Sequence, residues 1–174
     1  NYQISQSHSN LGTDGFIDIE VGGELKRIGI DNVHLEEDAG KLIHPEGRAV
    51  SYSMVDLNRA GTPLAEIVTK PDIRSVEEAV AYMETLQSML LYLDASDCKM
   101  QEGSLRFEAS ISLRPRGQQK LGNRVEIKNL NSMKAVAKCL EYEIRRQTQV
   151  LDEGGTVHQE TRLWDDINEV SAVM

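Results

Sequence analysis

Cysteine and long apolar runs are scarce in this sequence, and each scarcity excludes a class of protein. Cys98 and Cys139 are the only cysteines in 174 residues, and their separation fits no metal-ligand motif. Such usage suits a reducing compartment, and both thiols are expected to be inert packing residues. No apolar run approaches the roughly 18 residues that a membrane-spanning helix needs, and no secretory signal is recognisable. We therefore expect no membrane partner.

The sequence also lacks the motifs of the common nucleotide-binding and hydrolytic sites. No GxxxxGK[ST] or GxGxxG motif follows an expected strand, so P-loop and Rossmann folds have no support. No GxSxG elbow and no HExxH helix occur. The four histidines have no zinc spacing and are each expected on the surface or in a loop: His8, His34, His44 and His158. If this protein uses ATP, a sheet face with carboxylate-bound metal must hold the nucleotide.

The net charge of −9 is unevenly distributed along the chain. Residues 104–150 carry ten Lys and Arg against four Asp and Glu, whereas the segments on both sides are acidic. A basic segment inside an acidic protein can contact phosphate locally, while the chain as a whole repels nonspecific nucleic acid. The alternative is a basic helix face balanced by neighbouring acids. Charge alone leaves both interpretations open.

Three adjacent carboxylates, Glu36, Glu37 and Asp38, follow His34. They repel one another, so they form either a solvated acidic loop or one wall of a divalent-metal and phosphate site, since Mg²⁺ prefers oxygen ligands. If the strand before them continues, Glu37 projects to one face and His34, Glu36 and Asp38 project to the other. The three acids then face one site only if the strand ends or twists there.

Three more carboxylates, Glu66, Glu108 and Glu126, lie inside segments that are expected to be strands. Because an unpaired buried charge is very costly, each must be paired, ligated or at a sheet edge. The segments around Glu108 and Glu126 would pair antiparallel and bring both carboxylates together among Arg and Lys. Such a platform can hold metal and phosphate, or it is an ordinary solvent-facing sheet with cross-strand ion pairs.

Periodicity and turn residues predict the order of elements. The expected strands cover residues 16–21, 25–30, 50–57, 64–68, 104–114, 124–128 and 157–164, and the first two are joined by Gly22-Gly23. One helix is expected to begin with Ser75 as its N-cap, and a second near Asn131 or Ser132. The second is expected to end at Gly154-Gly155. Residues 1–15 are expected to be coil, and the acidic tail after Trp164 is expected to carry no further structure. The second helix is expected to bury Met133, Val136, Leu140, Ile144 and Leu151.

Strands and helices mix without regular βαβ alternation, which favours an α+β fold. We expect a single domain, with an antiparallel sheet, helices packed on its apolar face and an open polar face.

Several motifs resemble those of one known family. They are HLEEDAGK (34–41), VDLNRAGTPLAEIV (55–68), KPDIRS (70–75), MQEGSLR (100–106), ISLRP (111–115), EIKNLNS (126–132) and QETR (159–162). In this order they closely resemble the B subunit of the aspartyl/glutamyl-tRNA amidotransferase, over nearly the whole chain.

The resemblance implies a fold, a reaction and partners. The fold is the glutamine-synthetase-like cradle, and the cofactors are ATP and Mg²⁺. ATP phosphorylates the side-chain carboxylate of mischarged Glu-tRNA(Gln) or Asp-tRNA(Asn), and ammonia from the glutaminase, the A subunit, then displaces phosphate. The A and C subunits of a heterotrimer are the implied partners, in the bacterial cytoplasm or an organellar matrix. Residues 1–174 would be a partial cradle domain, without the N-terminal part and the C-terminal helical tail, and are not expected to turn over alone.

The resemblance also implies roles for particular residues. Glu66 and Glu126 match catalytic acids, and the implied metal ligands are Glu37, Glu108 and Glu126. Asn58, Arg59 and Lys128 are candidates for contacts to the nucleotide or the acyl phosphate. The family commonly has Asp at position 108 and Asn at position 110, where this chain has Glu108 and Ser110, which weakens the case for direct ligation by Glu108.

Two rival hypotheses stay open. One is a noncatalytic scaffold that docks the A subunit and the tRNA acceptor end, with the carboxylates merely solvated. The other is a glutamine-synthetase-like enzyme that acts on a free small acid. In either case the arrangement of the acids in the folded chain is the informative observation.

Overall fold

The computed structural model describes residues 4–43 and 52–174. The chain divides into two compact units, which are described separately: Asn1–Asp18 with Leu25–Asp72, and Ile19–Glu24 with Ile73–Met174. The predicted mixture of strands and helices in an α+β fold is confirmed. No helix in the described residues is both long and apolar enough to cross a membrane.

The first sheet contains β1 (Gly12–Val21), β2 (Glu24–Glu37) and β5 (Pro63–Thr69), in the order β1-β2-β5. The predicted turn between β1 and β2 is confirmed, since Gly22 and Gly23 have φ values of 62° and 83°, which glycine adopts without strain. β1 begins four residues earlier than expected, so the predicted coil ends at residue 11. Ile28 and Ile30 are buried along β2, and so is His34, which lies beyond a shift in the pairing register between Ile30 and Asn32.

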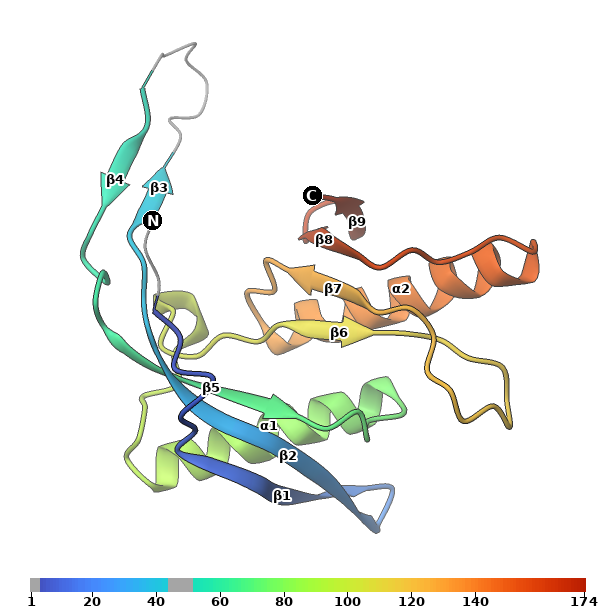
Figure 1. Ribbon diagram of the computed structural model, residues 1–174, viewed down its shortest axis with the longest axis horizontal. Coiled ribbons are helices and arrows are strands. Elements are labelled where there is room, and N and C mark those ends of the chain that lie inside the picture. The colour runs from blue at the N-terminus through green and yellow to red at the C-terminus, as the bar shows by residue number, and fades with distance from the viewer. Residues whose placement is uncertain (1–3, 44–51) are drawn as a thin grey trace. The chain divides into compact units, whose positions relative to one another are not determined.

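A separate ribbon is formed by β3 (Lys41–Ile43) and β4 (Met54–Asp56), which pair antiparallel (Figure 1). The strand expected over residues 50–57 is therefore shorter, and its first two residues lie outside the described chain, as does His44. Pro63 opens β5 at the edge of the first sheet, a position where its missing N–H breaks no ladder.

The second unit contains α1 (Val76–Tyr92), the 3₁₀ turn η1 (Met100–Glu102) and α2 (Met133–Asp152). Its sheet has the order β6-β7-β8-β9, from β6 (Ala109–Ile111), β7 (Val125–Lys128), β8 (Glu160–Asp165) and β9 (Val170–Val173). The predicted N-cap at Ser75 is confirmed, since its hydroxyl accepts from the backbone N–H of Glu78. The second helix is capped by Ser132, whose hydroxyl accepts from the backbone N–H of Ala135. α1 contacts α2, and α2 contacts β6 and β9.

The expectation of a purely antiparallel sheet is wrong at one pairing, because β7 and β8 run parallel. The physical reason is the connection between them. A tight turn joins only antiparallel strands, whereas α2 is long enough to return the chain to the same end of the sheet. β6 and β9 pair antiparallel with their neighbours.

Two other expectations about this sheet are corrected. The strand predicted over residues 104–114 is only Ala109–Ile111, because its single partner β7 has just four residues. The tail after Trp164 is structured and forms β9. Asp165 accepts hydrogen bonds from the backbone N–H groups of Ile167 and Asn168, and this turn returns the chain.

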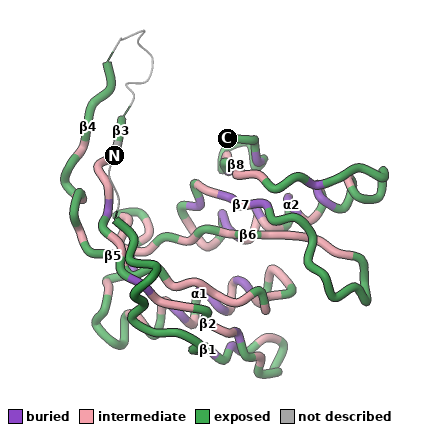
Figure 2. The backbone as a smooth tube through the Cα atoms, in the orientation of Figure 1, coloured by how far each residue is buried: buried purple, intermediate pink, exposed green. Residues whose placement is uncertain are grey.

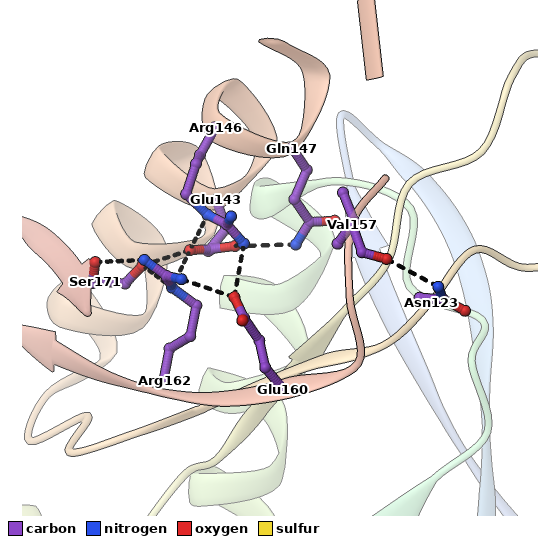
Figure 3. Close-up of polar contacts among 8 residues, drawn as sticks. All are labelled: Asn123, Glu143, Arg146, Gln147, Val157, Glu160, Arg162 and Ser171. Carbon is purple, nitrogen blue, oxygen red and sulfur yellow. Dashed lines mark hydrogen bonds and ion pairs between the residues drawn. The ribbon is translucent and has the colours of Figure 1, made fainter. Parts of the chain in front are cut away.

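The predicted buried face of α2 is also wrong in part. Leu151 is 40% exposed, and the buried residues of this helix are Ala135, Val136, Cys139, Glu143 and Gln147. The two polar residues are buried because Glu143 accepts hydrogen bonds from Arg146 and Gln147 beside Arg162 (Figure 3). An apolar periodicity does not reveal a buried acid that is paired in this way.

The core of this unit lies between α2 and the sheet (Figure 2). Val125, Ile127, Cys139 and Trp164 are each at most 1% exposed. The Trp164 ring meets the Tyr142 ring edge to face, with centroids 6.0 Å apart. Burial, with Glu143 nearby, raises the pKa of the Cys139 thiol to about 12, which makes this cysteine unreactive as predicted.

Candidate functional site

A cluster of one histidine and two carboxylates lies on the first sheet. His34 on β2 is the direct cross-strand partner of Glu66 on β5, so their side chains share one face. Glu36, two residues after His34, projects from that same face. The Nε2 atom of His34 lies 3.1 Å from Glu66 Oε2 and 3.6 Å from Glu36 Oε1. Two strands thus place three possible ligand groups together.

Hydrogen bonds define which nitrogen of His34 faces the acids. Asn32 donates from Nδ2 to Asp31, so its Oδ1 faces His34 Nδ1 at a distance of 2.8 Å. Nε2, on the other side of the ring, faces the two carboxylates. A cation shared by the three groups would balance the negative charge of the carboxylates.

The cluster has the composition and dimensions of a divalent-cation site. The candidate ligand atoms of His34, Glu36 and Glu66 all lie within 4.8 Å of one another. Adjacent ligand atoms of an octahedral ion with bonds of about 2.1 Å are about 3 Å apart, close to the observed His34–Glu66 separation. Carboxylates suit Mg²⁺ and Mn²⁺, whereas imidazole is more typical of transition metals. The residues therefore fit a hard divalent cation, and Mn²⁺ in particular.

A second cluster lies on the sheet of the other unit. Lys128 Nζ is 3.2 Å from Glu108 Oε1 and 3.3 Å from Glu126 Oε1. Glu126 Oε2 accepts a 3.3 Å hydrogen bond from the Thr161 hydroxyl. The antiparallel pairing of β6 with β7 brings Glu108 and Glu126 to the same lysine, as predicted. This mixed-charge surface holds one cation between two carboxylates, which leaves an excess of negative charge.

Electrostatics keep the second cluster charged. Burial raises the pKa of Glu126, but the hydrogen bond and charge of Lys128, with hydrogen bonds to Glu108 and Thr161, together outweigh burial and hold this pKa below its usual range. Burial likewise lowers the pKa of Lys128, and Glu108 and Glu126 raise it overall. Side-chain exposures of 30% for Glu126 and 39% for Lys128 leave both groups accessible to a ligand.

The remaining predicted site residues lie near the end of β2. Glu37 is exposed and projects from the face opposite His34, as strand alternation predicts. Arg59 Nε bonds to Oδ2 of the buried Asp38 at 2.9 Å. Asn58 lies in the adjoining turn, where its backbone N–H donates to Asp56. Arg59 is thus held by Asp38, with 37% of its side chain exposed.

The placement of His34 and Glu36 beside Glu66 could not be predicted from the sequence. His34 was expected on the surface or in a loop, but it lies in β2 and is only 5% exposed. The alternation of His34, Glu36 and Asp38 was readable from the sequence. The pairing of His34 with Glu66 depended on the strand register, which no local pattern defines. The convergence of Glu37, Glu66, Glu108 and Glu126 around one cation stays a prediction.

The chain is similar to proteins of one kind. A family model described as the GatB/GatE catalytic domain matches residues 1–174. All of the chain aligns, at 54% identity, with the B subunit of the aspartyl/glutamyl-tRNA(Asn/Gln) amidotransferase of Carboxydothermus hydrogenoformans, of which it covers 36%. The protein of the same name from Moorella thermoacetica is 55% identical over 100% of this chain. The one from Staphylococcus haemolyticus is 59% identical over 95% of this chain. It covers 37% and 34% of those two proteins, so it spans about a third of the length of these curated relatives.

Proposed function

The chain belongs to the GatB/GatE catalytic-domain family, and we propose that it carries part of the ATP-dependent step of tRNA-dependent amidation. In that step a side-chain carboxylate oxygen of a Glu or Asp esterified to tRNA attacks the γ-phosphorus of ATP, and ADP leaves. Ammonia then attacks the acyl carbon, phosphate leaves and one proton is lost. The products are the amide and inorganic phosphate. The placement of His34, Glu36 and Glu66, whose candidate ligand atoms all lie within 4.8 Å of one another, is the observation that carries this proposal.

The charge of each cluster supports a cation-dependent reaction. ATP and the aminoacyl carboxylate are both anions, and the two clusters offer Glu36, Glu66, Glu108 and Glu126. Such acids repel anionic substrates unless a divalent cation neutralises them. His34, Glu36 and Glu66 would hold one such cation, and Glu108 and Glu126 would offer ligands for another in their own unit. Glu37, on the opposite face of β2, stays a candidate ligand through the family resemblance alone. When bound, Mg²⁺ supplies charge neutralisation at the phosphates.

The chain's own residues have complementary tasks in this proposal. Lys128 is charged and accessible, so it can bind phosphoryl oxygens and stabilise the charge that develops during transfer. Glu126 holds Lys128 in place and faces the same open surface. Arg59, held by Asp38, offers its exposed edge to phosphate, and Asn58 lies beside it.

The proposal extends to the whole protein of which these residues would form a part. We propose a glutamine-synthetase-like cradle in the complete polypeptide, with ammonia supplied by a glutaminase A subunit and assembly with a C subunit. The support is the family membership and the name of the relatives, which specifies one subunit of an amidotransferase and its tRNA.

The first test uses the full-length polypeptide in its assembled complex. Glu66→Gln keeps the side-chain shape and removes one charge from the His34 cluster. We expect aminoacyl-tRNA-dependent ATP hydrolysis and amide formation to fall by about 10²- to 10³-fold, the usual loss for one preorganised electrostatic group. Glu84→Gln, at an exposed position of α1, is the matched control and should amidate like the wild type. Mn²⁺ binding, measured by electron paramagnetic resonance without ATP, should weaken in Glu66→Gln and stay unchanged in Glu84→Gln.

Two outcomes would replace this proposal. Wild-type amidation by both Glu66→Gln and Glu126→Gln would favour a scaffold that only docks its partners, with Lys128 and the acids forming ordinary surface ion pairs. Amidation of free glutamate in a reaction without tRNA would instead favour a glutamine-synthetase-like enzyme of small acids.

A further inference from the structure

The hydroxyl of Thr161 lies at the second cluster. Thr161 stands in the QETR motif (159–162), none of whose residues was predicted to have a role at the site. Thr161 on β8 is the register partner of Glu126 on β7, so the two side chains share the open face of the sheet. The hydroxyl donates to Glu126 Oε2 at 3.3 Å, while Lys128 contacts the other oxygen, Oε1, at 3.3 Å. Each oxygen of this carboxylate therefore has its own partner.

The residues on either side of Thr161 are anchored on the opposite face. Strand alternation directs Glu160 and Arg162 away from the open surface and toward α2. There Arg162 donates to Glu160 Oε1 at 2.7 Å, and to the side-chain and backbone oxygens of Ser171 at 2.7 Å each (Figure 3). Arg162 Nε also lies 3.4 Å from the fully buried Glu143. These contacts fix the register and the rotation of β8.

Glu143 is itself held rigidly inside this unit. It accepts hydrogen bonds from Arg146 at 2.8 and 2.9 Å and from Gln147 at 2.9 Å, together with the hydroxyl of Ser171. Figure 3 shows these groups converging on Glu143 between α2 and the strands. A buried network whose charged members are all paired rigidifies the elements that it joins. The contacts on the α2 side of the sheet therefore fix the position of Thr161 relative to β7.

From this arrangement we propose that Thr161 is a positioning residue for Glu126. A carboxylate has about four lone-pair sites, and Thr161 and Lys128 occupy one on each oxygen. Without the hydroxyl, the carboxylate is free to rotate so that both oxygens approach Lys128. With it, the remaining lone pairs stay directed to the open face, where the cation or the phosphate groups bind. This inference rests on the proposed function, because it assigns Glu126 to that site.

The test compares Thr161→Val, which removes the hydroxyl and keeps the β-branched shape, with Thr161→Ser, which keeps the hydroxyl. Both are made in the full-length polypeptide within its complex, and Thr148→Val on the exposed side of α2 is the control. We expect Thr161→Val to weaken Mn²⁺ binding without ATP, and to raise the apparent KM for Mg²⁺, by about 10-fold. Thr161→Ser and Thr148→Val should stay within about 2-fold of the wild type, with melting temperatures unchanged in all three.

Three other outcomes of these measurements are informative, and each contradicts a different part of the proposal. If Thr161→Val binds Mn²⁺ like the wild type while Glu126→Gln loses activity, the positioning role is wrong and the proposed function stands. If Glu126→Gln is also fully active, the assignment of Glu126 to the site fails first. A loss that Thr161→Ser does not restore, or that comes with a lower melting temperature, would show a packing role and overturn the inference.

Discussion

Replacing the buried Glu143 by glutamine tests how the second unit is held together. Glu143 and Glu160 balance Arg146 and Arg162, so the four charges sum to zero. Glu143→Gln keeps the volume but leaves one uncompensated positive charge, in a site where the side chains of Arg162 and Arg146 are only 11% and 22% exposed. The variant therefore separates charge pairing from packing.

The size of the effect follows from the remaining contacts. Removing one partner of a buried ion pair costs about 3–5 kcal/mol. Glu160 stays 2.7 Å from Arg162 and 3.7 Å from Arg146 and compensates in part. We therefore expect the free energy of unfolding to fall by about 3 kcal/mol, at the low end of that range.

Urea unfolding at neutral pH measures this loss. Trp164 is the only tryptophan and is 1% exposed, so its fluorescence reports the unfolding of this unit. With an m value of about 2–3 kcal/mol/M, the midpoint should drop by about 1–1.5 M. Glu141→Gln, at an exposed position of the same helix, is the control and should change stability by less than about 0.5 kcal/mol.

A double variant tests the charge argument directly. Glu143→Gln with Arg146→Gln restores the balance between Glu160 and Arg162, so the double variant should lose less stability than the two single losses added together. The expected coupling is at least about 0.5 kcal/mol. A Glu143→Gln midpoint equal to that of Glu141→Gln, or strict additivity in the double variant, would refute the reasoning.

Two more predictions concern acid and a helix end. Burial raises the pKa of Glu143, but hydrogen bonds from Arg146, Ser171 and Gln147 outweigh burial and hold this pKa below its ordinary value of 4.5. Because the pKa is lower in the folded state, the stabilisation that the Glu143 carboxylate gives the fold is complete above about pH 5. It is lost as the pH falls through the folded-state pKa. The stability gap between wild type and Glu143→Gln should therefore narrow in acid, and a gap that widens would contradict the assignment. Ser132→Ala removes the cap of α2 and should cost about 1 kcal/mol in urea unfolding, whereas Ser132→Asp should keep most of the cap.

Local signals in the sequence predicted local structure well. The caps at Ser75 and Ser132 and the turn at Gly22-Gly23 each depend on a few neighbouring residues, and all three are present. The polar face that carries Glu108 and Glu126 also follows from simple alternation.

Features that depend on distant residues were missed. Nothing near Val125 or Glu160 indicates that their strands run parallel, because the α2 connection decides the direction. No local pattern marks Glu143 as a buried acid of α2, because its partner Arg162 lies on a strand beyond the helix. His34 looked like an isolated histidine, and only the register of β2 with β5 places it beside Glu66.

The parallel pairing of β7 with β8 has a consequence for anyone who inserts residues into this chain. Successive strand residues face opposite sides, so a slip of one position would turn the Arg162 guanidinium out to solvent and force the Thr161 hydroxyl under the helix. Extra residues are tolerable in the exposed turn at Gly154-Gly155, where the helix has already ended. The same addition between Glu160 and Arg162 would place a guanidinium on the face that carries Glu126, and would leave Glu143 without its cationic neighbour on β8.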